Sequence, residues 1–460
     1  MSVMRFRVLF LIFLFAGLPA MPVYAVRLDI SAETDVQARS YNKILYLGKS
    51  YNDFYISENT KIGVFVSDIE LENYPDSRLG LGVSIRSISG LSTDNMAENP
   101  PLAQSQESYP SVNAMPYLHE AYIRADRILT EKLSAVVGRQ DYSLGQGISL
   151  GSDNIGFTGL LLRTENLFWG FGTDMFYFNP SRYDVSFSTS GNHVELSKHE
   201  RKYHVYGLAI NNKTEEGEWQ AYHFYQHYGE PSGSVGGNYV SETRSFSGIR
   251  YAMRKKHISF DGEAVMQGGT ADLSDGGKAD FSGYAFMLKG SWEQGIYIFD
   301  NVKLRLAYGR SSSASYKNDG SLATDRDSSF YAALGRRYDG FSRSGYGAIA
   351  AATLYDMSLS SDTANGMPVG YSGISVVNAG ADIPFKGLLF SIDYYKFKAS
   401  SANAVSKSNI ADETDLRIKW PLGSNLSMEL LCSYFIPGEK VYGKSAEKTM
   451  LSALSVSAKF

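Results

Sequence analysis

Apolar and polar residues alternate strictly in many segments of the chain. In the segment 78–86, leucine, valine and isoleucine occupy the odd positions, and arginine, glycine and serine occupy the even ones. The segments 120–126, 258–267, 302–308 and 415–420 repeat the pattern, with charged residues concentrated on one parity. Because successive side chains of a β-strand point to opposite faces, each segment predicts a strand with one apolar and one ionic face.

A secreted soluble sandwich and a transmembrane barrel both alternate in this way, but two further features favour the barrel. The alternating segments are about 10 residues long, which is the length of a tilted strand that crosses a membrane. Their connections also alternate between short and long. Short connections are expected at 212–217, 339–343, 382–386 and 421–424. Long connections, rich in Ser, Asn, Asp and Gly, are expected at 91–115, 141–156, 179–200, 229–242, 268–280, 310–327, 359–369, 399–410 and 436–448.

This sorting predicts an all-β, antiparallel outer-membrane barrel with short periplasmic turns and long extracellular loops. The alternation between Arg78 and Phe460 corresponds to about 18 strands, within a range of 16 to 20. The segment 26–77 is harder to interpret. Residues 62–66 could form one more strand there, with residues 41–47 as its partner.

The N-terminus has the pattern of a secretory signal peptide. Arg5 and Arg7 precede an uncharged apolar run, Val8–Leu18, and Val23-Tyr24-Ala25 resembles a cleavage site. The run is too short to cross a bilayer comfortably as a helix, which disfavours an uncleaved anchor. We therefore predict a signal peptide at 1–25 and a single barrel domain at 26–460.

Composition agrees with an envelope β protein and predicts no cofactor. Removal of residues 1–25 leaves a net charge of −6, which disfavours nucleic acid as a partner. Cys432 is the single cysteine, so an intramolecular disulfide and a cysteine-rich metal site are excluded. Tyr (32), Phe (25) and Gly (44) are abundant while Pro (13) is scarce, which favours many strands and turns.

The last residues resemble the terminal strand by which the barrel assembly machinery recognises its substrates. Met450, Leu454, Val456, Ala458 and Phe460 share one parity, and the chain ends on that aromatic residue. The expected partners are therefore the assembly machinery, through Phe460, together with outer-membrane lipid and lipopolysaccharide.

Two regions resemble the alginate export family of outer-membrane barrels. The segment 118–163 contains an EAY strand, a strand that ends in GRQ, a glycine-rich YSLGQG loop and a GLLLR strand. The segment 413–438 resembles the C-terminal hairpin of the family, with ETDL, LSM and FIPG in order. The resemblance implies an 18-stranded barrel whose lumen passes an anionic polysaccharide or another hydrophilic solute. It also implies lumenal arginines that attract uronate carboxylates, which guanidinium groups pair with bidentately.

Parity and resemblance together nominate pore-lining residues of both signs. The candidates are Arg124, Arg139, Arg163, Lys303, Arg305, Arg417, Lys419, Glu120, Asp126, Asp261, Glu263 and Asp415. This mixed lumen departs from a strongly cationic conduit, so a general diffusion or uptake porin remains open. In the plainer interpretation, these charges pair across neighbouring strands and keep the interior wet.

Arg139 poses a separate question, because its parity matches that of Ala135 and Val137. Parity directs it toward lipid, where it is tolerable only by snorkelling at the interface. A bulge at Gly138 would turn it into the lumen instead. The family resemblance favours the bulge.

Other candidate chemistry is weaker. His223 and His227 would lie about 13 Å apart on a strand, too far to chelate one ion. Asp272, Asp275 and Asp280 could hold calcium, although a solvated loop is preferred. None of the seven histidines lies in a catalytic motif, which disfavours a barrel enzyme such as a lipase or protease, and leaves a structural or adhesive barrel as a minor alternative. Trp169, Tyr177, Tyr308, Tyr394, Trp420 and Tyr434 are expected to form aromatic girdles.

Overall fold

The structure is a computed structural model that describes most of the chain from Val26 onward. The described residues are 26–46, 49–71, 74–92, 115–152, 156–168, 170–180, 202–229, 239–273, 275–296, 299–312, 325–328, 330, 332, 334, 347–349, 363–364, 367–368, 374–399, 409–438 and 447–460. The predicted signal peptide, the turn expected at 339–343 and Trp169 lie outside them.

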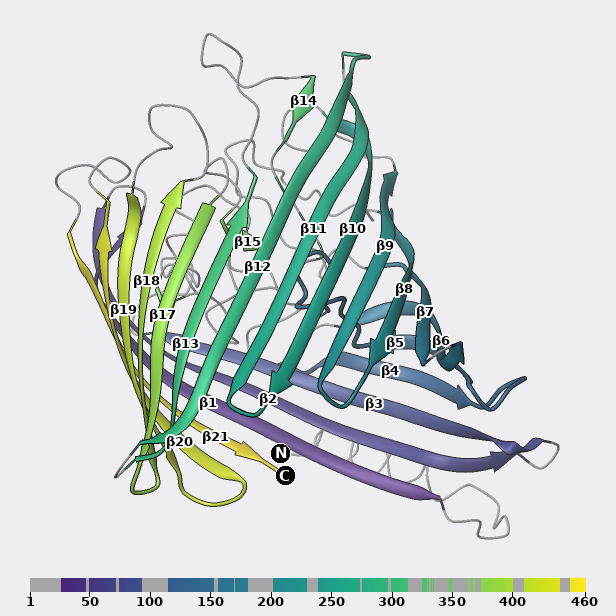
Figure 1. Cartoon of the computed structure of the whole chain (residues 1–460), viewed down its shortest axis with the longest axis horizontal. Helices are drawn as coiled ribbons and strands as arrows, with labels where there is room; N and C mark the ends of the chain where they lie inside the picture. The colour runs from purple at the N-terminus through teal and green to yellow at the C-terminus, as the bar shows by residue number, and fades with distance from the viewer. Residues whose placement is uncertain are drawn as a thin grey trace, which may run out of the picture.

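Within the described ranges, eighteen long strands form one closed antiparallel barrel (Figure 1). They are β1 (Arg27–Tyr46), β2 (Lys49–Leu71), β3 (Tyr74–Ser92), β4 (Tyr117–Asp126), β5 (Leu133–Gln140), β6 (Phe157–Phe168), β7 (Phe171–Phe178), β8 (Lys202–Lys213), β9 (Gly217–Gly229), β10 (Tyr239–Lys255), β11 (Ile258–Leu273), β12 (Lys278–Ile296), β13 (Phe299–Ser311), β17 (Ile374–Phe385), β18 (Leu388–Ala399), β19 (Asn409–Pro421), β20 (Leu426–Pro437) and β21 (Thr449–Lys459). Each pairs with the next, and β1 pairs with β21 from Glu33↔Lys459 to Asn42↔Met450, which closes the barrel. This part of the chain contains no helix long and apolar enough to cross a membrane.

Three short elements lie outside this ladder of long strands. β14 (Arg326–Asp327) pairs in parallel with β12, and β15 (Thr363–Ala364) pairs with β16 (Met367–Pro368). β13 pairs with β12 on one edge and directly with β17 on the other. β13 and β17 are therefore neighbours in the barrel although they are far apart in the sequence.

The total of eighteen strands confirms the expected count, but the strands are distributed differently. Sixteen of them lie from β3 onward, and the segment 26–77 supplies the other two in β1 and β2. In that hairpin, Tyr41 lies opposite Asp53 and Ile62 lies opposite Ala32. Residues 41–46 and 62–66 thus lie on two strands that pair with each other, as expected, but not directly opposite each other, because both strands are about twice the length that the alternation suggested.

Strand length varies from 8 to 23 residues, with β2 the longest. About 9 to 11 residues suffice to cross a bilayer, so the longest strands continue beyond the membrane. The region 268–280, expected as a long loop, belongs mostly to such strands. β11 runs to Leu273 and β12 starts at Lys278, so only a tight connection separates them.

The expected short connections are confirmed at one end of the barrel, which lies at the bottom of Figure 1. There β10 and β11, β17 and β18, and β19 and β20 are joined by two to four residues. Lys386 and Gly387, between β17 and β18, have φ values of 50° and 81°. Two consecutive positive φ values are typical of the type I′ turn, whose twist matches that of the flanking strands.

The two faces of the barrel follow the predicted parity. Leu81, Ile123, Leu306 and Leu454 are exposed on the outer face, where lipid replaces water as the solvent. Tyr177, Tyr394, Trp420 and Tyr434 are exposed on this face as well. The polar residues of the same strands therefore face inward.

We predict that an arginine on the outer face destabilises the barrel and that the same residue one position further along does not. Leu454→Arg, near the middle of β21, is expected to lower the free energy of unfolding by about 2–4 kcal/mol. Ser455→Arg, which points into the lumen, should change it by less than about 1 kcal/mol. Urea unfolding from lipid vesicles measures both, and equal losses would contradict the assignment of faces.

Candidate functional site in the lumen

The segment 141–152, here called the inner loop, leaves β5 and folds into the barrel. Leu144, Ile148 and Leu150 are completely buried, although no strand contains them. Gly145 and Gly147 have φ values of 57° and 84°, a left-handed conformation that glycine adopts without steric cost. The sharp turn closes on itself, because the amide of Leu144 donates to the carbonyl of Leu150 at 3.0 Å.

Aromatic side chains on the inner face of β6 to β10 support the inner loop. The ring of Tyr142 lies 5.0 Å from that of Phe176 and 5.3 Å from that of Phe178. Phe224 and Phe246 continue the row on β9 and β10, with centroids 4.9 Å apart. These phenylalanines occupy the parity that faces the lumen. The expectation of a polar inner face is therefore wrong for this side of the barrel, because the inner loop shields it from water and burial of aromatic surface is favourable.

Glu263 on β11 anchors the turn of the inner loop to the barrel wall. Its carboxylate accepts hydrogen bonds from the hydroxyl of Tyr222, at 2.5 Å, and from the amide of Gln146. A Cβ atom at Gly145 would collide with this carboxylate, so the loop can approach closely only with glycine there. Glu263, predicted to line the pore, is completely buried and serves as a structural acceptor.

A second inward segment, 347–349, is held in the same way by a second carboxylate. Glu413 on β19 accepts hydrogen bonds from the amides of Ala348 and Ile349, at 2.6 and 2.7 Å. The inner loop has a further backbone contact, since the amide of Gly151 donates to the carbonyl of Leu334 at 2.8 Å. Sequence reasoning missed the role of Glu413, because its only signal was membership of the ETDL stretch.

Most predicted lumenal charges lie in ion pairs across neighbouring strands or along one strand. Arg163 pairs bidentately with Asp174 at 2.8 and 2.9 Å, and Arg250 pairs with Asp261 at 2.8 and 3.0 Å. Further pairs are Arg124 with Asp126 at 2.8 Å, Arg305 with Asp382 and with Asp393 at 2.9 Å, and Arg417 with Asp415 at 3.5 Å. The plainer interpretation of these charges thus agrees with their geometry.

Two cavities lined by charged residues lie among the described residues of the barrel. The larger, of about 610 Å³, lies toward the turns between β8 and β9, and Lys303 and Arg305 line it. The smaller, of about 430 Å³, lies between the inner faces of β1 to β3 and β19 to β21 and the segment 347–349. Its charged lining consists of Arg39, Lys61, Arg86, Arg417, Lys419, Glu33, Asp35 and Glu429. We call it the basic cavity, because five cations there face three carboxylates.

Three cations of the basic cavity differ from Lys61 and Arg417, which pair with carboxylates. Arg39 donates to the amide oxygen of Gln37 at 2.6 and 3.0 Å. Arg86 donates from Nε to the neutral amide oxygen of Asn59 at 2.7 Å. Among the residues that the structure describes, neither Arg86 nor Lys419 forms an ion pair with a carboxylate. Their charge is therefore available to a solute.

Arg139 does not line the lumen, which corrects the expected bulge at Gly138. The ladder from β4 to β5 and on to β6 is continuous through Gly138, with Arg139 opposite Ala121 and Thr158. Arg139 therefore shares the outer face with Val137, and its guanidinium lies 3.4 Å from the Thr158 hydroxyl. It lies at the end of β5, where a long side chain reaches the polar interface.

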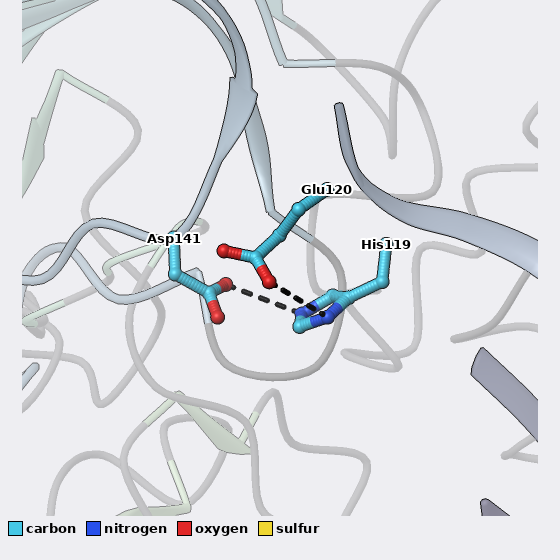
Figure 2. Close-up of side chains that lie close together, drawn as sticks. All are labelled: His119, Glu120 and Asp141. Carbon is cyan, nitrogen blue, oxygen red and sulfur yellow. Dashed lines mark ion pairs between the residues drawn. The ribbon is translucent and has the colours of Figure 1, made fainter. Parts of the chain in front are cut away.

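The irregularity in this region lies one strand away, at His119. The register of β3 against β4 shifts between Ser84 and Ile85, so His119 and Glu120 are both buried on the inner side. Figure 2 shows them facing Asp141, the first residue of the inner loop. His119 Nε2 lies 3.2 Å from Asp141 Oδ1, and His119 Nδ1 lies 3.8 Å from Glu120 Oε2.

Burial by itself raises the pKa of Asp141, but its neighbours outweigh this effect. The His119 ring, the Lys61 ammonium group and the Ser152 hydroxyl stabilise the ionised carboxylate. The pKa of Asp141 therefore lies below its ordinary value of 3.8.

The other predicted candidates stay apart from the lumen. His223 and His227 each lie within hydrogen-bonding distance of a hydroxyl on β10, at 2.8 and 2.9 Å. Asp272 accepts a hydrogen bond from Ser241, and Asp275 accepts one from Gly277. In the described part of the chain, the one convergence of three histidine or carboxylate side chains is His119, Glu120 and Asp141.

We predict that Glu263→Ala releases the inner loop. Loss of the acceptor leaves the Gln146 amide and the Tyr222 hydroxyl without their partner, at a cost of about 1–3 kcal/mol. The single-channel current in planar bilayers should become larger and noisier. Glu218→Ala, on the neighbouring β9 and beside the larger cavity, is the matched control and should leave the current steady. A Glu263 variant indistinguishable from this control would show that the loop is held by other contacts.

Comparisons with known proteins agree with this architecture. The sequence model of the alginate export family matches residues 92–350, which is more than half of the chain. No curated protein matches the sequence. The fold is similar to that of OccK5 (OpdH) of Pseudomonas aeruginosa, with a TM-score of 0.54, 12% identity, and coverage of 94% of this chain and 98% of that one.

The outer-membrane protein OpdK of the same organism is similar as well, with a TM-score of 0.52, 12% identity and the same coverage. A crystal structure of OpdK with vanillate has a TM-score of 0.51 and 11% identity, again over 94% and 98% of the two chains. At such identities these likenesses concern the fold alone, while the family match covers the inner loop and its aromatic support. The chain therefore belongs to the alginate export family and is a β-barrel channel for solutes in the bacterial outer membrane.

Proposed function

We propose that this channel conducts an acidic hydrophilic solute past the basic cavity, with a uronate-bearing saccharide as the first candidate. The observation that carries the proposal is the state of Arg86 and Lys419, whose charges are not neutralised by a carboxylate in the described part of the barrel. A solute carboxylate can replace the amide of Asn59 beside Arg86 and form a charge-assisted pair.

The use of the lumenal carboxylates supports this assignment. Glu263 and Glu413 accept hydrogen bonds from the inward segments, and Asp174 and Asp261 pair with arginines. Carboxylates committed in this way repel an anion less than free ones would. Because each ion pair cancels one charge of either sign, the charge that a passing solute meets at the basic cavity comes from the residues of that cavity, which include five cations and three carboxylates.

The geometry also favours passage over tight binding. The basic cavity offers cations from several different strands, so a polyanion can exchange one contact for the next. Conduction requires contacts that are favourable enough to admit the solute and weak enough to release it. The same cations would attract the uronates of an extended chain one after another.

A small carboxylate is the second candidate, and the size of the cavity favours it. About 430 Å³ is within the range of small-molecule sites, and the inward segments narrow the lumen beside it. OpdK, which shares the fold, has been crystallised with vanillate. An uptake channel for such solutes would use the same cations.

The proposal assigns transport and no catalytic step to the lumen, and it includes the partners expected from the sequence. The side chain of Phe460 is 71% exposed on the outer face, and its backbone pairs with Ala32 of β1 at 2.7 and 3.0 Å. An exposed terminal aromatic suits recognition by the assembly machinery after removal of the signal peptide at 1–25. The apolar outer face suits outer-membrane lipid and lipopolysaccharide.

The ion selectivity of the reconstituted channel tests the proposal. Under a gradient of KCl across a planar bilayer, the reversal potential should show a preference for chloride. Arg86→Gln and Lys419→Gln should each lower the anion-to-cation permeability ratio about two- to fivefold, because one charge in wet surroundings contributes about 0.5–1 kcal/mol. Arg139→Gln is the matched control, since it removes a guanidinium from the outer face and should leave the ratio unchanged.

Blocking experiments then separate the two candidate solutes. Uronate oligosaccharides should interrupt the current of the unmodified channel at lower concentration than neutral oligosaccharides, and this difference should shrink in Arg86→Gln. Interruption by a small aromatic carboxylate and not by the oligosaccharides would support the second candidate. A channel that prefers potassium would refute both.

A further inference from the structure

The cluster of His119, Glu120 and Asp141 is distinct from the basic cavity, and its residues come from two elements. His119 and Glu120 belong to the bulge in β4, and Asp141 begins the inner loop. Their ligand atoms, one nitrogen and two carboxylate oxygens, all lie within 4.8 Å of one another. Figure 2 shows the three side chains converging on one point.

His119 presents a buried nitrogen without a hydrogen-bond partner in the described part of the chain, which points to a ligand more strongly than the carboxylates do. Its side chain is 1% exposed, yet Nε2 makes no hydrogen bond within the described residues. This nitrogen nevertheless lies only 3.2 Å from Asp141 Oδ1. Two donors bound to one zinc ion at about 2.0–2.2 Å, in tetrahedral or octahedral geometry, lie about 3.0–3.4 Å apart. The spacing thus suits two ligands of one ion.

The ligands around this nitrogen favour one class of metal. An imidazole with carboxylates suits zinc and its first-row neighbours, whereas calcium and magnesium prefer oxygen ligands only. The other ring nitrogen is oriented by Ser84, whose hydroxyl lies 3.3 Å from Nδ1 and donates to Glu120 at 2.8 Å. Such a second contact fixes the orientation of a metal-binding histidine.

Lys61 shares the cluster and has to be included in its charge. Its Nζ lies 3.0 Å from Glu120 Oε2 and 3.9 Å from Asp141 Oδ2. Two carboxylates and one ammonium group leave a net negative charge beside the imidazole. The lysine therefore weakens a divalent site through repulsion without neutralising it. Access is open, because the side chain of Asp141 is 45% exposed.

We propose that His119 Nε2, Asp141 and Glu120 bind a divalent first-row transition-metal ion, with Zn²⁺ as the representative, and that this ion ties the inner loop to β4. The ion would bridge β4 of the barrel and the inner loop, which narrows the lumen. Metal binding therefore steadies the inner loop in its inward position. This inference does not depend on which solute the channel conducts.

Zinc titration of the purified, folded chain in detergent micelles tests the site. A competition assay with a chromophoric chelator should show one Zn²⁺ per barrel, and Mg²⁺ should not compete. His119→Ala and Asp141→Asn should each weaken Zn²⁺ binding at least about tenfold, the smallest loss usually seen when a metal site loses a supporting residue. His223→Ala, which removes an outer-face histidine, is the matched control and should bind Zn²⁺ like the unmodified chain.

Lys61→Gln provides a result that a merely structural cluster would not give. Removal of the ammonium group should tighten Zn²⁺ binding several-fold, because it removes a repulsion about one contact away from the ion. Asp141→Asn, on the loop, decides the matter if His119→Ala does not fold. Zinc affinity that is the same in Asp141→Asn as in the His223→Ala control would falsify the site. Failure of the anion preference in planar bilayers would leave this zinc result intact, so the two proposals fail separately.

Discussion

Pairing of the backbone in a medium without water is the constraint on which the rest of this structure depends. In lipid, each unpaired amide or carbonyl group costs several kcal/mol, so a sheet can cross only if it has no free edge. Here every long strand pairs on both edges, and the ladder between β1 and β21 joins the two ends of the sheet. Once the sheet closes, one parity of every strand faces lipid and the other faces a lumen.

An eighteen-stranded cylinder is too wide for its own side chains to fill. On one side, the inner loop fills this space by packing onto a row of aromatic rings. Burial of their apolar surface stabilises the inward position of the loop. On the other side, charged residues of β1 to β3 and β19 to β21 line the basic cavity. In the proposed function, a solute passes along the charged side and not along the aromatic side that the inner loop occupies.

The described inward segments are not part of the barrel ladder, so their buried amides need acceptors other than a paired strand. Glu263 and Glu413 supply them, and a carboxylate is a strong acceptor in surroundings of low dielectric constant. Such a charge is costly to bury without partners, so its amide donors and its own burial are mutually dependent. The same arrangement keeps both carboxylates buried and out of direct contact with the open lumen.

The class of the fold was accessible from the sequence, since alternation is a local property that each strand displays by itself. The inward direction of Arg305 and Arg417, and the outward direction of Leu306 and Leu454, follow from parity. Strand lengths were less accessible. In β1, β2 and β11, polar residues continue the strand pairing beyond the membrane. A strand length taken from the thickness of the bilayer therefore assigns these residues to loops.

For the residues of the lumen, too, the sequence predicted the direction of a side chain but not its contacts. Parity predicted that Glu263 points inward, but not that it holds an amide of the inner loop, because that contact joins residues 117 positions apart in the chain. For Arg139, parity correctly predicted the outer face, and the bulge that the family resemblance favoured was wrong. By itself, then, the sequence determined which residues face lipid and which face the lumen, through the two-residue period of the strand. Only the tertiary structure decided which lumenal charges are committed and which remain for a solute, because burial and pairing arise between distant segments once the barrel has closed.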